Sequence, residues 1–218
     1  MINSSKRKLS LSGWLKENDN VSYNTSLKLQ KFLFFYEVLT KVAGEQAEFN
    51  YLKGYKNGPV FSNVWGDYTK ESDQFKLESQ KAYQTNKESI NEERAKICSF
   101  IVGTMTEKEL SDFTHLMNIW KSKEDRIMSG EKQVRLEESD FNFYDEELIQ
   151  KLSDMYPMQL IENSKIINMD KKYFVFSKEN AEKLTEEHLD TLLILSENTD
   201  IYNPVFVELD EEERLVVD

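Results

Sequence analysis

The strongest pattern along the chain is a run of apolar residues that recur at helical spacing on nearly every side. A helix that is apolar all round must be buried, so we predict that residues 27–42 form the central helix of a bundle. The members of this run are Leu27, Leu29, Phe32, Leu33, Phe34, Phe35, Tyr36, Val38, Leu39 and Val42. Ahead of it, residues 1–20 predict one short helix that docks on the central helix through Leu9, Leu11, Trp14 and Leu15.

The segment after the central helix predicts a short extended piece at residues 49–55, a turn at residues 56–59 and a second helix. Gly58 permits an unusual backbone turn, and Pro59 fits the first position of a helix. One apolar face follows at helical spacing, made by Phe61, Val64, Trp65 and Tyr68. Residues 71–93 are polar with few apolar positions, so we expect a loop or a weak strand pair there.

The middle of the chain predicts further helices. One ends near Gly103, and another begins with a capping box formed by Thr106 and Glu109. The latter helix carries Thr114 and His115 on its flank and has an apolar side made of Leu110, Phe113, Met117 and Trp120. Residues 121–139 are charged and weakly patterned, which favours a domain boundary. A short amphipathic helix over residues 148–156 is then stopped by Pro157.

The last quarter of the chain changes character. Residues 166–176 read as one hairpin, residues 203–217 as another, and a helix capped by Thr185 lies between them. We therefore predict a mainly helical α+β fold with a short strand pair. Residues 1–130 would form the helical domain, and residues 131–218 a small α+β extension of two hairpins and a helix.

Composition narrows the kinds of partner. The 218 residues carry a net charge of −12, which disfavours nucleic-acid phosphates and favours a basic protein partner. Three basic residues, Lys6 to Lys8, are expected to form a solvated tail. No stretch approaches the roughly 18 apolar residues of a membrane span. The single cysteine, Cys98, is expected to be a small buried hydrophobe in a protein of the reducing cytoplasm.

The residues that carry chemistry are sparse. His115, His188 and Cys98 lie far apart in sequence, so we expect no metal site. The seven glycines form no phosphate-binding loop, and the acid pairs lack the apolar surroundings of an acid catalyst, so we expect no cofactor and no catalytic residue. The sequence thus predicts a protein that is not an enzyme.

Four residues allow more than one interpretation. His115 could act as a base, but we favour a structural role in which Thr114 bonds the preceding helical turn and His115 bonds a backbone carbonyl near the Gly58 turn. Lys31 lies in an apolar run, so its ammonium is expected to reach solvent or pair with an acid. Trp65 and Tyr68, together with Lys31, are the candidate contacts for a partner.

Two blocks of sequence resemble the Panacea domain family, also called SocA-like. The first runs from Leu29-Gln30-Lys31-Phe32 through Tyr36 to Gly58-Pro59-Val60, and the second is Leu110-Ser111-Asp112-Phe113-Thr114-His115 with a downstream Trp120. The motif residues are Leu29, Lys31, Tyr36, Gly58, Pro59, Val60, Thr114, His115 and Trp120. Met117 and Ile119 stand where the family commonly has an acid and a proline.

The resemblance implies a helical Panacea-like unit and a function. Panacea-like domains are antitoxin modules that neutralise toxins encoded next to them, typically by direct protein binding. The extension outside the motifs is then a candidate for toxin choice. Two alternatives stay open: a proteolytic adaptor that delivers a toxin to a protease, and a phage or prophage protein that interferes with a bacterial host system.

Overall fold

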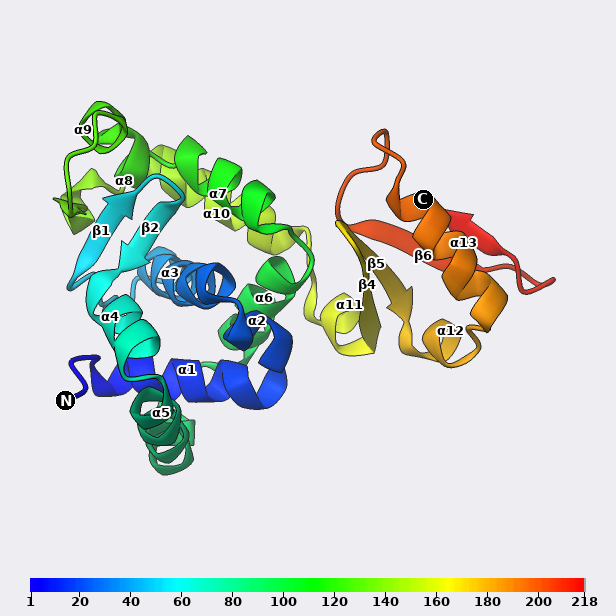
Figure 1. The fold of residues 1–218 in the computed structure, drawn as a ribbon, viewed down its shortest axis with the longest axis horizontal. Coiled ribbons are helices and arrows are strands. Elements are labelled where there is room, and N and C mark those ends of the chain that lie inside the picture. The colour runs from blue at the N-terminus through cyan, green and yellow to red at the C-terminus, as the bar shows by residue number, and fades with distance from the viewer. Residues whose placement is uncertain (218) are drawn as a thin grey trace.

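The chain folds into a helical unit and a smaller C-terminal unit that lie side by side (Figure 1). The structure is a computed structural model and describes residues 1–217. A mainly helical α+β fold is confirmed, because thirteen α-helices accompany one three-stranded and one four-stranded sheet in the described residues. None of the helices in this range is long and apolar enough to cross a membrane.

The predicted central helix is α3, Ser26–Val42, and the other helices of the helical unit surround it. Its aromatic residues are fully buried, and the ring of Phe32 stacks on Trp14 from the first helix with centroids 5.7 Å apart. Helices α6 and α10 pack on other sides of α3. The bounds of the first helices and of those that pack on α3 are α1 Lys6–Asn18, α2 Asn20–Asn24, α6 Glu92–Gly103 and α10 Phe143–Asp154.

Residues 71–93 differ from the expectation of a loop or weak strand pair, which is wrong. They form α5, Ser72–Asn86, and a short 3-10 helix, Lys87–Ser89, ahead of α6. Helix α5 packs closely on α1 at Gly13, where an added Cβ would lie 2.2 Å from the carbonyl oxygen of Ser79. The buried stripe of α5 contains only Phe75, Ser79 and Tyr83. Because a serine and a glycine make the contact, the apolar pattern was too weak to reveal the helix.

The first sheet has the order β2-β1-β3. Extended structure ahead of the Gly58 turn is confirmed by β1, whereas the expectation that Pro59 opens a helix is wrong. Pro59 lies in the edge strand β2 opposite Gly54, where a residue without an N–H is tolerated. The next helix, α4, begins at Ser62. The bounds are β1 Leu52–Tyr55, β2 Gly58–Phe61, β3 Val134–Arg135 and α4 Ser62–Lys70.

The capping box of Thr106 and Glu109 is confirmed at the start of α7. Beyond α7, strand β3 pairs with β1, and α10 packs on α3. Residues 134–163 therefore pack on the helical unit, and the second sheet begins only at Ser164; a division into independent domains at residue 130 stays a prediction. The remaining elements of this part are α7 Glu107–Leu116, α8 Asn118–Lys121, α9 Glu124–Met128, η2 Glu138–Asp140 and α11 Met158–Asn163.

The C-terminal unit, residues 164–217, confirms both hairpins and the helix capped by Thr185. A parallel pairing of β5 with β6 joins the hairpins into one sheet of order β4-β5-β6-β7. One face of this sheet holds a small core around Phe174 and Leu192, while Val175 belongs to the core of the helical unit. The bounds are β4 Ser164–Met169, β5 Lys172–Ser177, α12 Lys178–Glu182, α13 Glu186–Ser196, β6 Val205–Leu209 and β7 Leu215–Val217.

Candidate functional site

The site is built on the turn between β1 and β2. Gly58 has a φ of +96°, a conformation that L side chains rarely adopt. The ammonium of Lys31, from α3, donates to the carbonyl of Asn57 at 2.7 Å and to the hydroxyl of Thr114, from α7, at 3.1 Å. Three segments that are far apart in sequence therefore meet beneath one turn.

Glycine is required at position 58 for a second reason, which is space. A Cβ there would lie 2.2 Å from Nζ of Lys31 and 2.4 Å from Oγ1 of Thr114. Such distances are far below van der Waals contact, so any side chain at this position would displace the lysine. The turn, the lysine and the threonine form one closely packed unit.

Lys31 is completely buried, so the expectation that its ammonium reaches solvent or pairs with an acid is wrong. Both of its hydrogen-bond acceptors are uncharged oxygens. Burial lowers the pKa of Lys31 well below the ordinary value of a lysine. Lys31 therefore stabilises the turn from the interior. Its ammonium would influence a partner only by fixing the shape of that turn.

Thr114 and its neighbour Ser111 complete the attachment of α7 to the turn. The hydroxyl of Thr114 lies 3.0 Å from the carbonyl oxygen of Leu110, in the preceding helical turn. The interpretation that Thr114 bonds its own helix is thus confirmed. The hydroxyl of Ser111 donates to the carbonyl of Asn57 at 3.3 Å, so that carbonyl accepts from two different helices.

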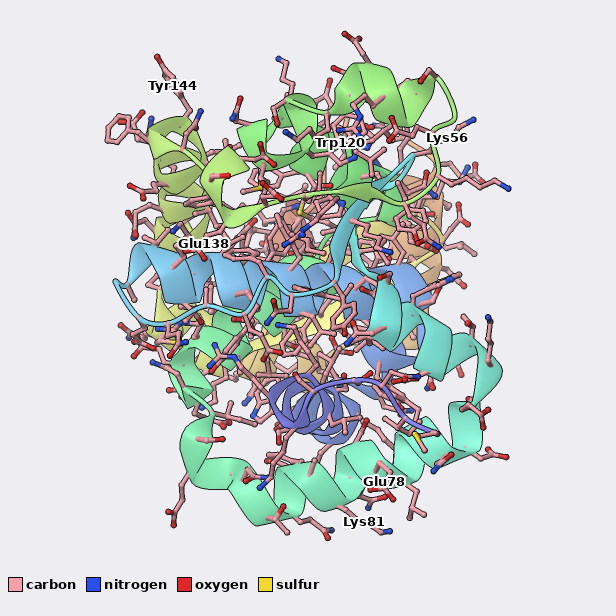
Figure 2. The ribbon with its side chains drawn as sticks, turned by 90° about the vertical axis from the view of Figure 1, so that its left-hand side faces the viewer. Lys56, Glu78, Lys81, Trp120, Glu138 and Tyr144 are labelled. Atoms are coloured by element: carbon pink, nitrogen blue, oxygen red, sulfur yellow. The ribbon has the colours of Figure 1, made fainter. Side chains whose placement is uncertain are left out.

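His115 stacks on Trp120 with ring centroids 3.9 Å apart and an angle of 21° between the rings. The indole of Trp120, which is labelled in Figure 2, donates to the carbonyl of Tyr55 at 2.9 Å and so ties α8 to β1. Nε2 of His115 is buried without a hydrogen-bond partner. Burial, and then the charge of Lys31, lower the pKa of His115, which favours the neutral ring. His115 therefore packs beside the turn, where a backbone hydrogen bond with Lys56 acts against the fall in its pKa.

The sequence reading missed residues that support this arrangement. Gln30 accepts the N–H of Phe61 at 2.8 Å and so fixes β2 to α3. Asp145 accepts the N–H groups of Asn118 (2.5 Å) and Ile119 (3.0 Å), at the start of the helix that carries Trp120. The signal for Asp145 was present, because it also completes a capping box with Asn142 at the start of α10. No local pattern marks the carbonyl of Asn57.

A cavity of about 390 Å³ opens beside the turn. Trp65 is on its rim and 42% exposed, and Pro59 and Val60 contribute to its apolar lining. The other lining residues are Ser26, Leu27, Gln30, Lys31, Tyr55, Lys56, Asn57 and Glu107. A half-exposed tryptophan above a firmly held turn is a surface suited to receive an apolar side chain from a partner.

The remaining predicted residues lie away from the cavity. Tyr68 donates to the carbonyl of Tyr23 at 3.2 Å and packs edge-on against Phe75, so it is partly buried against the core. Leu29 is fully buried in α3. The hydroxyl of Tyr36 accepts the N–H of Asn91 at 2.9 Å. Of the three candidate contacts, only Trp65 combines exposure with a place at the cavity.

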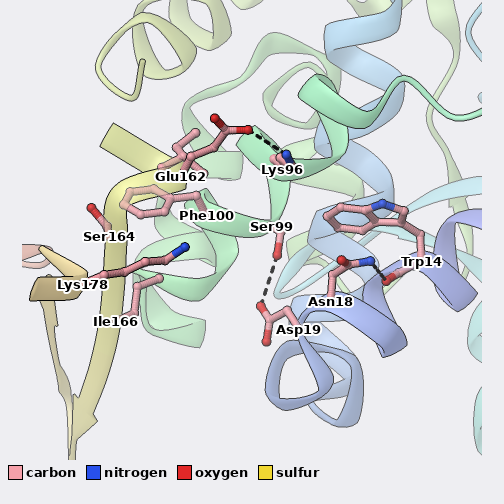
Figure 3. Close-up of a pocket in the computed structure, with 11 residues that line it drawn as sticks. Trp14, Asn18, Asp19, Lys96, Ser99, Phe100, Glu162, Ser164, Ile166 and Lys178 are labelled. Atoms are coloured by element: carbon pink, nitrogen blue, oxygen red, sulfur yellow. Dashed lines mark hydrogen bonds and ion pairs between the residues drawn. The ribbon is translucent and has the colours of Figure 1, made fainter. Parts of the chain in front are cut away.

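A second cavity, of about 510 Å³, lies where the two units meet (Figure 3). Of its charged groups, Lys96 pairs with Glu162 at 2.8 Å, and Asp19 accepts from the neutral hydroxyl of Ser99 at 3.3 Å. Lys178, from α12, extends into the same space (Figure 3). With both signs of charge in its lining, this cavity favours no single class of ligand as clearly as the first.

Packing contacts, rather than metal-binding groups, characterise the part of the chain that the structure describes. In residues 1–217, no three His, Cys, Asp or Glu side chains are grouped so that they could hold a metal ion. Cys98 is buried, as expected, and burial raises the pKa of its thiol. No protein-family model, curated protein or solved structure matches this chain. The arrangement around Gly58 can hold a rigid apolar surface and offer it to another molecule.

Proposed function

We propose that this protein is a Panacea-like antitoxin that neutralises a toxin by direct protein–protein binding. The observation that carries the proposal is the half-exposed Trp65 at the cavity beside the Gly58 turn. Lys31 and Thr114 belong to the sequence motifs of that family. Lys31 donates hydrogen bonds to the turn and to Thr114, and these bonds hold the turn in place. The motif residues would thus preserve the shape of a binding surface, and binding to a preorganised surface costs less conformational entropy.

Electrostatics support a protein partner of opposite charge. The net charge of −12 would speed encounter with a basic toxin, because complementary charge raises association rates. Burial of Trp65 would then set the lifetime of the complex, since tryptophan is among the residues that contribute most to binding. Catalysis has less support, because His115 packs on Trp120 and the thiol of Cys98 is buried.

The test is expression of the neighbouring gene in a bacterial host with and without this protein, followed by co-purification of the two products. A neighbour that is toxic alone, harmless together and recovered in a stable complex supports direct binding. Disappearance of the neighbour in the presence of a protease would instead support the proteolytic adaptor. A neighbour that is harmless alone would contradict both.

Trp65→Ala tests the surface itself. We expect it to weaken the complex by at least about 30-fold, the effect of losing an interface residue worth 2 kcal/mol or more. Tyr144→Ala is the matched control, because Tyr144 is 75% exposed on α10 and projects from another part of the surface (Figure 2). Equal affinities of the two variants, measured by calorimetry, would remove the cavity from the interface.

A further inference from the structure

The negative charge of the protein is concentrated in the C-terminal unit. Residues 164–218 contain 14 Asp and Glu against 6 Lys and Arg, a net charge of −8 out of the total of −12. The turn between β6 and β7 alone carries Asp210, Glu211, Glu212 and Glu213, with Arg214 as its one basic residue. A quarter of the chain therefore produces most of the field that a charged partner would meet.

This acidic turn adjoins an open sheet edge. Strand β7 is the last strand of the order β4-β5-β6-β7, and within residues 1–217 its outer side has no neighbouring strand. Val216 and Val217 are 48% and 39% exposed. Proteins usually protect such edges with lysine, proline, a bulge or a very short strand; β7 is short, with three residues, but its sequence Leu-Val-Val contains no lysine or proline.

The outward-facing backbone groups of β7 follow from its register. The N–H of Asp210 donates to the carbonyl of Arg214 at 3.0 Å, in the same register that pairs Leu209 with Leu215. Hydrogen-bonded and non-hydrogen-bonded pairs alternate along an antiparallel ladder. Leu215 and Val217 therefore direct their N–H and carbonyl groups away from β6, where an added strand would meet them.

We propose that β7 is a docking edge that adds one extended segment of a basic protein partner as a fifth strand. The segment would carry apolar residues at alternate positions, to cover Val216 or Val217, and Lys or Arg at its flanks, to meet the acidic turn. Main-chain hydrogen bonds give such an added strand its affinity, and the alternate side chains give it specificity. That this partner is the toxin rests on the function proposed above.

Charge decides between a foreign segment and a second copy of this chain. Antiparallel pairing of two β7 edges would place two turns, each containing four carboxylates and one guanidinium, at opposite ends of a three-residue strand, about 10 Å apart. At this distance like charges still repel at low salt and so oppose association of two copies. A basic segment meets the same turn with attraction, and so it is the occupant that this edge fits.

The decisive experiment uses a displayed library of random seven-residue segments, selected on the full-length protein and then tested on Val217→Pro. This variant removes the outward N–H of Val217, and proline is tolerated on an edge strand when its nitrogen faces solvent. Val217→Thr, which keeps the N–H, is the matched control. We expect selected segments to be basic with alternating apolar residues, and to bind Val217→Pro at least 10-fold more weakly than Val217→Thr.

Further measurements separate this loss from a folding defect. Amide exchange along β6 should be the same in both variants, and a bound segment should slow exchange at Leu215 and Val217. If Val217→Pro disturbs β6, the double variant Glu208→Lys with Glu211→Lys replaces it, because both side chains are exposed. That variant should weaken binding by about the same factor at low salt and by less at high salt.

Three results would overturn the proposal. One is a selection whose segments bind wild type and Val217→Pro equally, another is enrichment of acidic or neutral segments, and the third is a dimer of this chain that Val217→Pro dissolves. The library result is independent of any toxin, so the docking edge can fail while the antitoxin function stands. Conversely, a harmless neighbouring gene product would remove the antitoxin function and leave the library result intact.

Discussion

The helical unit and the C-terminal unit handle charge in opposite ways. The helical unit buries Lys8, Lys31, Glu37, Asp67 and Asp145, and each of these has hydrogen-bond partners inside the protein. The C-terminal unit has a small apolar core, and the only buried polar residue of its described part is a serine, Ser196. Its many carboxylates lie at the surface instead. One unit thus uses charge to fix its interior, and the other presents charge to its surroundings.

This difference indicates which substitutions should lower the stability of each unit most. A buried charge is costly unless its partner is present, so loss of one member of a buried pair is far more damaging than loss of an exposed pair. The expected solvated tail at Lys6 to Lys8 illustrates this, and that expectation is wrong. Lys8 is buried and pairs with Glu37, while Arg7 bonds the same carboxylate at 2.8 Å.

The largest effect is expected for Glu37→Gln. Glu37 is fully buried and accepts from Arg7, from Lys8 and from the N–H of Glu48 at 2.9 Å. Its loss leaves the buried Lys8 without a counter-charge, so we expect the free energy of unfolding to fall by about 3–5 kcal/mol, measured by urea denaturation.

The control for Glu37 is Glu78→Gln, which removes an exposed ion pair with Lys81 on α5 (Figure 2). Exposed pairs contribute little, and we expect a change below about 1 kcal/mol. Similar losses in Glu37→Gln and Glu78→Gln would contradict the comparison between buried and exposed charge.

The next effect is expected for Gly58→Ala. The positive φ of Gly58 and the contact of an added Cβ with Lys31 both oppose the substitution, and we expect a loss of about 3 kcal/mol. Gly66→Ala is the matched control, because Gly66 lies within α4 and an added Cβ meets nothing within 4 Å.

Alanine at position 66 should raise the free energy of unfolding by up to about 1 kcal/mol, since alanine favours a helix interior. Thermal unfolding of both variants should show a lower stability than wild type for Gly58→Ala and a higher one for Gly66→Ala. If Gly58→Ala leaves the free energy of unfolding unchanged, the turn can move without Lys31. That result would contradict the close packing of the turn, the lysine and the threonine.

The smallest effect concerns the contact between the two units. The ammonium of Lys28, on α3, donates to the hydroxyl of Tyr173, on β5, at 3.0 Å. Burial lowers the pKa of Lys28 to about 8, below the 10.5 of a free lysine, so between these values the unfolded chain binds more protons. The contribution of Lys28 to the free energy of unfolding therefore rises with pH, because deprotonation removes the cost of burying its charge.

Lys28→Met removes that pH dependence. We expect the difference in free energy of unfolding between wild type and Lys28→Met to change by about 2 kcal/mol from pH 8 to pH 10, in favour of wild type. Urea denaturation across this range measures it. Parallel profiles of the two proteins would show that Lys28 is not held in a buried contact between the units.

Part of the candidate site could be read from the sequence. The blocks that contain Lys31, Gly58 and Thr114 were recognisable as motifs, and the capping box at Thr106 fixed where α7 begins. What each motif residue does was not readable. Lys31 was expected to reach solvent or to pair with an acid because it lies in an apolar run, whereas its acceptors are a carbonyl and a hydroxyl from distant segments.

The sequence by itself determined the buried helix α3, the capped helices and the two C-terminal hairpins. Each of these depends on spacing, capping or turn residues within a few positions of one another. Only the tertiary structure decided that α5 is a helix against Gly13, that β5 and β6 pair in parallel, and that Lys31 lies beneath Gly58. Those features depend on small residues and backbone groups brought together by long-range packing, and such contacts leave no periodic pattern in the chain.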